Sequence, residues 1–191
     1  MFVKICGITH REDALAAVEA GAGAIGFVFY KSSPRAADPA AIAPWISEIP
    51  PAVWKVGVFV NETPEIIEQI AANLRLDIAQ LHGDETPALH PRKIRIWRAF
   101  RISGDALPPS GYPAEAILLD GHGKGATFDW HLANRITGNV IIAGGLTPEN
   151  VRAAVEQTNP WGVDTASGVE SSPGRKDHAR MKQFIKAALG S

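Results

Sequence analysis

The chain alternates between short runs of consecutive apolar, β-forming residues and longer segments in which apolar residues recur at helical spacing. Each short run ends at a glycine or a polar residue, which is the pattern of a buried strand that enters a turn. The predicted strands cover residues 2–6, 24–30, 53–60, 78–81, 95–102, 116–119, 139–143 and 161–164. Parallel strands that are buried on both faces have this continuous apolar pattern, so we expect strands that alternate with helices.

Helix-start signals follow most of the predicted strands. Thr9 and Glu12 have the spacing of a capping box, and Asp38 before Pro39 fits an N-cap residue followed by proline at the first helical position. After Thr63, apolar residues at helical spacing predict one buried helix face. The residues of that face are Ile66, Ile67, Ile70 and Leu74. Helices are predicted over residues 10–20, 39–49, 147–155 and 177–189, from 64 onward and from about 130 onward.

Two of the connections are too short or too rich in proline for a full helix. Pro91 soon ends the helix that Thr86 and Pro87 would begin, and residues 103–114 contain three prolines and two glycines. The fourth and fifth helices are therefore predicted to be shortened.

The spacing of the strands predicts the architecture. Strand starts recur every 17 to 29 residues, which is the length of one strand, one helix and two short loops. Eight such units predict an α/β protein whose single domain, residues 1–191, is a closed (β/α)8 barrel. The alternative is an open doubly wound sheet, which would want a glycine-rich fingerprint after the first strand, where the sequence has only Gly7.

Composition and charge narrow the class of protein. The chain has 191 residues, 46% hydrophobic and 20% charged, with a net charge of −1, which is typical of a globular enzyme. Because basic and acidic residues are interspersed, no basic face is expected for nucleic acid. No apolar run approaches the ~20 residues of a membrane span, and the N-terminus enters a strand directly, so we expect a cytoplasmic protein. The single cysteine excludes an intramolecular disulfide, and no metal site is predicted.

Two glycine-containing turns near the end of the chain are candidate phosphate-binding sites. Gly144 and Gly145 follow the seventh predicted strand, and Ser167 and Gly168 follow the eighth. Backbone N–H groups at such turns can approach an anion closely, and a helix N-terminus adds partial positive charge. Each glycine alone could merely end a strand, but phosphate sites of eightfold barrels lie on these two loops.

The C-terminal strand ends form the catalytic face of a barrel, and two residues there could carry acid and base chemistry. Cys6 ends the first strand near the start of the first helix, where a lowered pKa would make it a thiolate base. The alternative is a small buried apolar residue. Asp120 follows an apolar run, where burial would raise its pKa and keep it protonated as a general acid. It could instead cap the next helix or pair with Lys124.

Other polar residues at the mouth are candidates for substrate binding. Arg35 follows a proline in the loop after the second strand and could bind a carboxylate bidentately, although a solvated loop arginine is the alternative. His82 could donate to a substrate or tie the fourth strand to its neighbour, and Asp164 ends the eighth strand. His122 lies in a glycine-rich loop and is expected to face solvent.

Seven motifs give the chain a resemblance to a known family. They are KICGIT (4–9), GVFVN (57–61), QLHGDE (80–85), LLD (118–120), FDW (128–130), AGGLTPENV (143–151) and GVDTASGVESSPGRKD (162–177). In this order, over nearly the whole chain, they resemble phosphoribosylanthranilate isomerase. The resemblance implies an Amadori rearrangement of N-(5′-phosphoribosyl)anthranilate to a 1-deoxyribulose 5-phosphate in tryptophan biosynthesis.

The resemblance also implies roles for individual residues. It assigns the general base to Cys6, the general acid to Asp120, the contact with the anthranilate carboxylate to Arg35, and phosphate to the AGGL and SGVE turns. Opening a ribosylamine ring needs an acid at the ring oxygen, and forming the enamine needs a base at C2, without a metal or a redox cofactor. We therefore expect a small phosphorylated substrate, no cofactor, no nucleic acid or membrane partner, and a monomer or a homodimer.

One departure and two alternative functions bear on this interpretation. Ala166 stands where the family commonly has a serine, so backbone N–H groups or Ser167 must supply that phosphate contact. A histidine-pathway ketol isomerase performs the same rearrangement on another aglycone, but it has an aspartate in place of Cys6 and an internal repeat that this chain lacks. A non-enzymatic barrel that serves as a partner subunit would be expected to have lost Cys6 or Asp120, and both are present.

Overall fold

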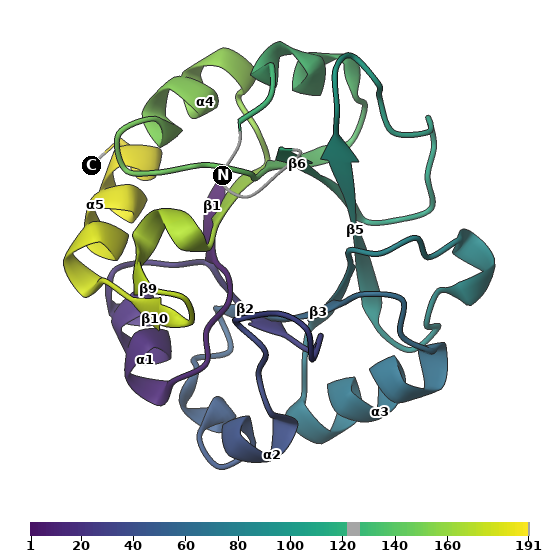
Figure 1. The fold of residues 1–191 in the computed structure, drawn as a ribbon, viewed down its shortest axis with the longest axis vertical. Coiled ribbons are helices and arrows are strands. Elements are labelled where there is room, and N and C mark those ends of the chain that lie inside the picture. Colours follow the sequence, from purple (N-terminus) through teal and green to yellow (C-terminus); the bar gives the residue numbers. More distant parts are fainter. Residues whose placement is uncertain (122–126, 191) are drawn as a thin grey trace.

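Eight parallel strands close into a barrel in the computed structural model, which describes residues 1–121 and 127–190 (Figure 1). The barrel strands are β1 (Phe2–Ile5), β2 (Ala24–Val28), β3 (Trp54–Phe59), β4 (Ile78–Leu81), β5 (Arg95–Ile102), β6 (Ala116–Gly121), β7 (Asn139–Ile142) and β8 (Gly162–Thr165). Each strand pairs with the next in sequence order, and β1 pairs with β8, with Lys4 opposite Asp164. The predicted (β/α)8 barrel is therefore confirmed, and the open doubly wound sheet is wrong.

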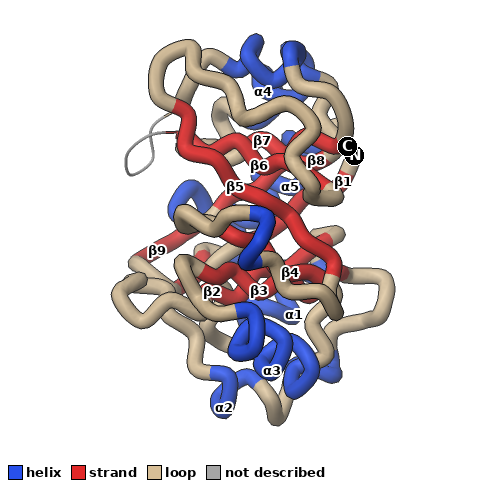
Figure 2. The backbone as a smooth tube through the Cα atoms, turned by 90° about the vertical axis from the view of Figure 1, so that its right-hand side faces the viewer, coloured by secondary structure: helices blue, strands red, loops and turns tan. Residues whose placement is uncertain are grey.

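Helices cover the outside of the barrel (Figure 1). The α-helices are α1 (Arg11–Glu19), α2 (Pro39–Ile42), α3 (Pro64–Leu74), α4 (Val151–Thr158) and α5 (His178–Leu189). The described residues also form four short 3-10 helices, η1 (Ile46–Glu48), η2 (Pro87–Leu89), η3 (Trp130–Arg135) and η4 (Ser167–Val169). From the side, the strands lie between α2 and α3 at one end of the molecule and α4 at the other (Figure 2). Among the described residues, no helix is long and apolar enough to cross a membrane.

The helix starts differ from the sequence prediction where side chains have other partners. Thr9 does not cap α1, because its hydroxyl donates to the carbonyl oxygen of Gly174 at 2.6 Å. The N-cap residue is His10, which makes no side-chain capping bond. Asp38 caps α2 as predicted, but this helix ends at Ile42.

Other helical segments differ from the prediction in position, orientation or length. Helix α4 begins at Val151, because Asn150 Oδ1 accepts from the backbone N–H of Thr147 and holds the preceding turn. In α3 the buried residues are Ile67, Ala71 and Leu74. Ile66, which was predicted to belong to the buried face, is 41% exposed and lies outside it. Residues 103–115, all of them described, form no helix, and the segment after β4 has only η2. The approach to η3 through residues 122–126, with His122, lies outside the described residues.

Aromatic side chains fill the barrel at the N-terminal end of its strands. The ring of Phe2 lies 5.0 Å from that of Trp161, 5.3 Å from Trp54 and 5.5 Å from Trp97, measured between centroids. These rings close one end of the barrel with apolar surface. The polar residues inside the barrel therefore gather toward the opposite, C-terminal end.

A small hairpin follows β8 and was not predicted. Strands β9 (Glu170–Ser172) and β10 (Arg175–Lys176) pair antiparallel just before α5. Asp177 caps α5 by accepting from the backbone N–H of Arg180. The hairpin places Glu170 and Lys176 beside the mouth of the barrel, where they contact residues of other loops.

Candidate active site

The C-terminal mouth of the barrel contains a cavity of about 770 Å³. It is lined by eight of the nine residues that the sequence predicts for the site: Cys6, Arg35, His82, Asp120, Gly144, Gly145, Asp164 and Ser167. The ninth, Gly168, follows Ser167 in the same turn. Side chains from five different strand ends or loops thus share one space of the size that binds a small molecule.

Cys6 lies just after β1, lines this cavity and is only 7% exposed. Its backbone N–H donates to the carbonyl oxygen of Thr165 at 2.8 Å, which fixes the residue against β8. Gly26 on the neighbouring strand makes room for the thiol, since a Cβ atom there would come within 2.8 Å of the Cys6 sulfur and 3.0 Å of Lys4 Nζ. The side chains of Cys6 and Lys4 therefore meet above Gly26.

The environment of Cys6 corrects one sequence prediction. Burial raises the pKa of the Cys6 thiol, and the positive charge of Lys4 lowers it again only in part. The predicted lowering of this pKa is wrong in direction, and α1, whose N-terminus was expected to cause it, begins only at Arg11. Among the charged side chains that act on the thiol, Lys4 has the largest lowering effect on its pKa.

Lys4 is a residue of the site that sequence reasoning missed. Its side chain is fully buried, and Nζ donates to Asp164 Oδ1 at 2.9 Å. Burial opposes the charge, but Asp164 and Cys6 outweigh it and raise the pKa of Lys4, so the ammonium keeps its proton at neutral pH. The signal was present in the sequence, since Lys4 and Cys6 are two positions apart and must share one face of the strand.

Asp120 and His82 form a pair across the mouth. Asp120 Oδ2 lies 3.1 Å from His82 Nε2, and the Asp120 side chain is 27% exposed. Gln80 Nε2 lies 3.4 Å from the other ring nitrogen, which suits a ring whose Nε2–H donates to the carboxylate. Asp120 is thus partly exposed rather than enclosed by apolar residues. It does not cap η3, because Asp129 does so; its alternative partner Lys124 lies outside the described residues.

A buried ion pair shapes the loop that carries His82. Arg98 donates to Glu85 at 2.9 Å and to the carbonyl oxygens of Leu81 and Gly83. Glu85 in turn accepts from the backbone N–H groups of Gly83 and Asn61. All of these groups hold the turn after β4 in place. Arg98 therefore positions the loop and does not reach the cavity.

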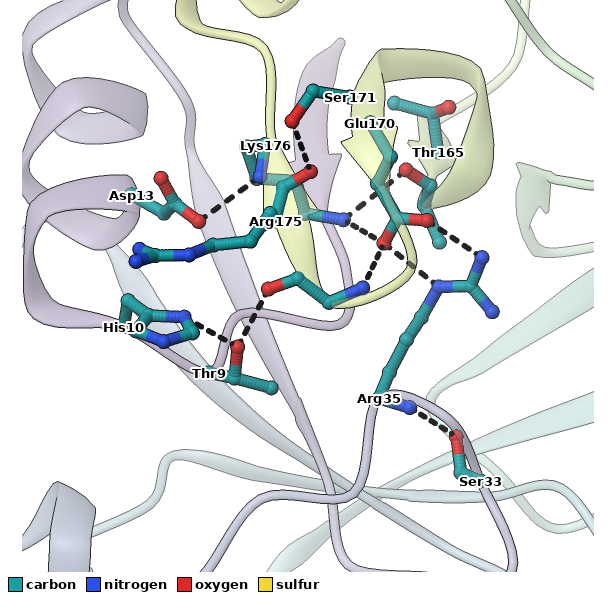
Figure 3. A network of polar contacts seen from close by, with 12 residues as sticks. Thr9, His10, Asp13, Ser33, Arg35, Thr165, Glu170, Ser171, Arg175 and Lys176 are labelled. Carbon is teal, nitrogen blue, oxygen red and sulfur yellow. Dashed lines mark hydrogen bonds and ion pairs between the residues drawn. The ribbon is translucent and has the colours of Figure 1, made fainter.

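Arg35 reaches across the mouth to the hairpin after β8 (Figure 3). Its Nε and Nη2 donate to the two carboxylate oxygens of Glu170 at 2.8 and 2.7 Å, and Lys176 Nζ donates to the same carboxylate at 2.9 Å. Burial tends to raise the pKa of Glu170, but the two cations outweigh it and lower that pKa. The predicted alternative of a solvated Arg35 is wrong. Arg35 and Lys176 share the single carboxylate of Glu170, so the three residues together have a charge of +1. The Nη1 edge of the Arg35 guanidinium remains for a second carboxylate.

The two glycine turns lie against each other at the end of β7 and β8. Gly144 and Gly145 have φ angles of 76° and 63°, which favour glycine. A Cβ atom on Gly168 would lie 1.9 Å from the carbonyl oxygen of Leu146, the same oxygen that accepts from Thr165 Oγ1 at 2.8 Å. The close contact brings the backbone of both turns to one side of the cavity. This geometry suits an anion that is bound by main-chain N–H groups.

Together these features define a class of protein. A parallel eightfold barrel with a thiol, a carboxyl group and an arginine in one cavity, beside paired glycine turns after β7 and β8, is typical of barrel enzymes that act on small phosphorylated substrates. The comparisons with known proteins identify the family within this class.

The family model described as N-(5′phosphoribosyl)anthranilate (PRA) isomerase matches residues 3–187. The chain is 50% identical to the N-(5′-phosphoribosyl)anthranilate isomerase of Trichlorobacter lovleyi, with 97% of each chain covered. The crystal structure of phosphoribosyl anthranilate isomerase from Thermotoga maritima has a TM-score of 0.92 and 43% identity over the whole of both chains. The chain belongs to the N-(5′-phosphoribosyl)anthranilate isomerase family.

A further solved structure of this family contains a ligand. It is a phosphoribosyl anthranilate isomerase in complex with reduced 1-(o-carboxyphenylamino)-1-deoxyribulose 5-phosphate, with a TM-score of 0.89 and 42% identity over the whole of both chains. The ligand of that relative carries both a carboxylate and a phosphate. The family match over residues 3–187 favours this isomerase over the alternative of a histidine-pathway ketol isomerase.

Proposed function

We propose that this protein isomerises N-(5′-phosphoribosyl)anthranilate to 1-(2-carboxyphenylamino)-1-deoxy-D-ribulose 5-phosphate in tryptophan biosynthesis, in the cytoplasm, as a monomer or a homodimer. The observation that carries the proposal is the shared cavity, in which Cys6 and Asp120 are brought together with Arg35 and the glycine turns. Such a cavity offers a base, an acid, a carboxylate site and a phosphate site to one substrate.

The acid and the base each perform one proton transfer of the reaction. Asp120, in its protonated form, gives its proton to the ring oxygen as the C1–O bond breaks and the anilino nitrogen forms a C1=N iminium bond. The Cys6 thiolate takes the proton from C2. The C2–H electron pair forms the C1=C2 bond while the iminium electrons return to nitrogen. The resulting enolamine becomes the ketone when the C2 hydroxyl loses a proton and C1 gains one.

The two ends of the substrate are bound on different sides of the mouth. The free edge of Arg35 faces the anthranilate carboxylate, and Glu170 holds the other edge so that the guanidinium does not swing into solvent. The phosphate occupies the turns with Gly144, Gly145, Ser167 and Gly168. Binding at both ends fixes the sugar between Cys6 and Asp120, which favours reaction by orientation.

A fluorescence assay tests the proposed function. The unstable substrate is generated in situ from anthranilate and a phosphoribosyl donor, and the decay of anthranilate-type fluorescence is followed after the protein is added. A rate that depends on protein concentration, and that is lost in the Cys6→Ala protein, supports the proposal. Purified, folded protein without any such rate contradicts it.

Arg35→Ala is expected to lower kcat/KM by roughly 10- to 150-fold, mainly through KM. The reason is that a charge-assisted contact with the substrate carboxylate is worth about 1.5 to 3 kcal/mol. Steady-state kinetics measure the effect. Arg11→Ala is the matched control, because Arg11 forms the same two-pronged pair with Glu48 on an exposed surface outside the cavity. Unchanged kinetics of Arg35→Ala would refute the assigned role.

Gly144→Ala is expected to raise KM for the phosphorylated substrate and to lower the free energy of unfolding by about 1 to 3 kcal/mol. A Cβ atom at this position would lie 2.1 Å from the backbone nitrogen of Gly121 and 2.8 Å from Asp120 Oδ1. Steady-state kinetics and denaturant unfolding measure the two effects. Gly104→Ala is the control, because Gly104 also has a positive φ of 59° but open space around it. Equal effects of the two substitutions would contradict the prediction.

A further inference from the structure

Lys4 is a buried charge that the reaction described above does not use. Its side chain lies inside the barrel, two residues before Cys6 on β1, and has no exposed surface. Burying an ammonium group is costly unless it is paired. Asp164, opposite Lys4 in the β1–β8 register, supplies that pairing at 2.9 Å. An apolar residue would fill this position without such a cost, which points to a functional role for the charge.

The position of the charge relative to the thiol suggests that reason. A Cβ atom on Gly26 would lie within 3.0 Å of both the Cys6 sulfur and Lys4 Nζ, so these two atoms lie close together above this glycine. Four charged groups act on the thiol or are influenced by it: Lys4 on β1, Asp164 on β8, Lys176 on β10 and Arg35 in the loop after β2. Of the charges that act on the pKa of Cys6, that of Lys4 has the largest effect, and it lowers the pKa.

We propose that Lys4 is a positioning residue that supplies the fixed positive charge beneath Cys6 and so stabilises the Cys6 thiolate that takes the C2 proton. This inference rests on the proposed function for the identity of the reaction. In the base step the C2 proton moves to the Cys6 sulfur, while Lys4 keeps its own proton before and after. Lys4 therefore acts only through the charge state of Cys6.

Asp164 affects the thiol in two opposite ways. Its carboxylate keeps Lys4 protonated and holds Nζ in place, although by its own negative charge it opposes the thiolate. Lys4 therefore lowers the pKa of Cys6, and Asp164 raises it by a smaller amount. Lys176 and Arg35 share the single carboxylate of Glu170, which offsets one of their two positive charges. Among the cations that act on the pKa of Cys6, Lys4 has the largest effect.

The single cysteine of the chain makes the proposal directly measurable. The ultraviolet absorbance of thiolate, followed as a function of pH, reports Cys6 alone when each variant is compared with its Cys6→Ala counterpart. Lys4→Met removes the charge at similar length. We expect its thiol titration midpoint to rise by about 1 to 3 pH units, because an opposite charge at this range has an effect of that size. We expect kcat/KM to fall ~10- to 10³-fold at neutral pH and to recover at higher pH.

Three further variants make the outcome decisive. Lys4→Arg keeps the charge and should keep the midpoint near that of the parent. Lys55→Met removes a similar strand lysine, paired with Asp77 at 3.0 Å at the other end of the barrel, and should change neither readout. If Lys4→Met does not fold, Lys4→Met/Asp164→Asn removes both buried charges together. Its midpoint should still rise, because the effect of Lys4 exceeds that of Asp164.

The results distinguish failure of this inference from failure of the proposed function. An unchanged thiol midpoint in folded Lys4→Met, or in Lys4→Met/Asp164→Asn if Lys4→Met does not fold, overturns the inference, as does a loss of activity in Lys4→Met that no increase in pH restores. A parent protein without isomerase activity overturns the proposed function. In that case the thiol titrations still decide whether Lys4 stabilises the thiolate.

Discussion

Replacing Cys6 with serine is expected to lower kcat by about 10²- to 10⁴-fold while the protein stays folded and still binds its ligand. Loss of a general base typically costs this much. Serine keeps the size of the side chain and its hydrogen-bonding capacity, but its hydroxyl does not form the anion that a thiol forms at accessible pH. Because Cys6 is buried at the end of β1 and packs against Gly26, a substitution of similar volume should leave the barrel intact.

Steady-state kinetics, thermal unfolding and calorimetric binding of a reduced product analogue measure these expectations. Cys6→Ala is the companion variant and should lose at least as much activity. A Cys6→Ser protein nearly as active as the parent would make Cys6 a packing residue. The base would then have to be Asp164, His82 or Glu170. Each of these already has a close partner, in Lys4, Asp120 and Arg35 respectively.

The order and approximate bounds of the strands could be predicted from the sequence, because a glycine or proline lies near almost every strand end. Strands β4 and β5 have the predicted bounds, and the others differ by one or two residues at their ends. The helices were predicted less well, since their starts depend on contacts that are distant in sequence. Thr9 is the clearest case, because its hydroxyl bonds to Gly174, 165 positions away, instead of capping α1.

The positions of the site residues could also be predicted better than the contacts between them. Residues at strand ends could be assigned to the mouth because a parallel barrel brings all of these ends to one face. Pairings between loops could not be predicted, since nothing local links Arg35 to Glu170, 135 positions away. The buried charge of Lys4 was missed for another reason. Lysine is rarely buried without a partner, and the partner Asp164 is adjacent only after the barrel closes between β1 and β8.

The side-chain contacts that the sequence did not reveal determine the charge and orientation of the predicted site residues. Cys6 alone is a buried thiol with a raised pKa, and Lys4 provides the nearby charge that counteracts burial. Arg35 alone is a loop residue, and Glu170 with Lys176 orients it across the mouth (Figure 3). The candidate catalytic and substrate-binding residues thus lie at positions that the sequence indicates, while their charge and orientation depend on neighbours such as Lys4 and Glu170.

Replacing Asp120 with asparagine is expected to lower kcat by about 10²- to 10⁴-fold with little change in ligand binding or stability. The amide of asparagine keeps the size of the carboxyl group and can still accept from His82 Nε2, which lies 3.1 Å from Asp120 Oδ2. It has no acidic proton to give to the ring oxygen, so the step that opens the ribosylamine loses its general acid.

The pH dependence separates this loss from an effect on the base. The activity of Asp120→Asn should stay low at every pH, because no pH turns the amide into a proton donor of suitable strength, whereas the activity of Lys4→Met should recover as the thiol ionises. Asp129→Asn is the matched control, since Asp129 caps η3 outside the cavity and its substitution should leave kcat unchanged. If Asp120→Asn retained near-parental kcat, the proton would have to come from another group, and His82, whose Nε2 lies 3.1 Å from Asp120 Oδ2, would be the first candidate.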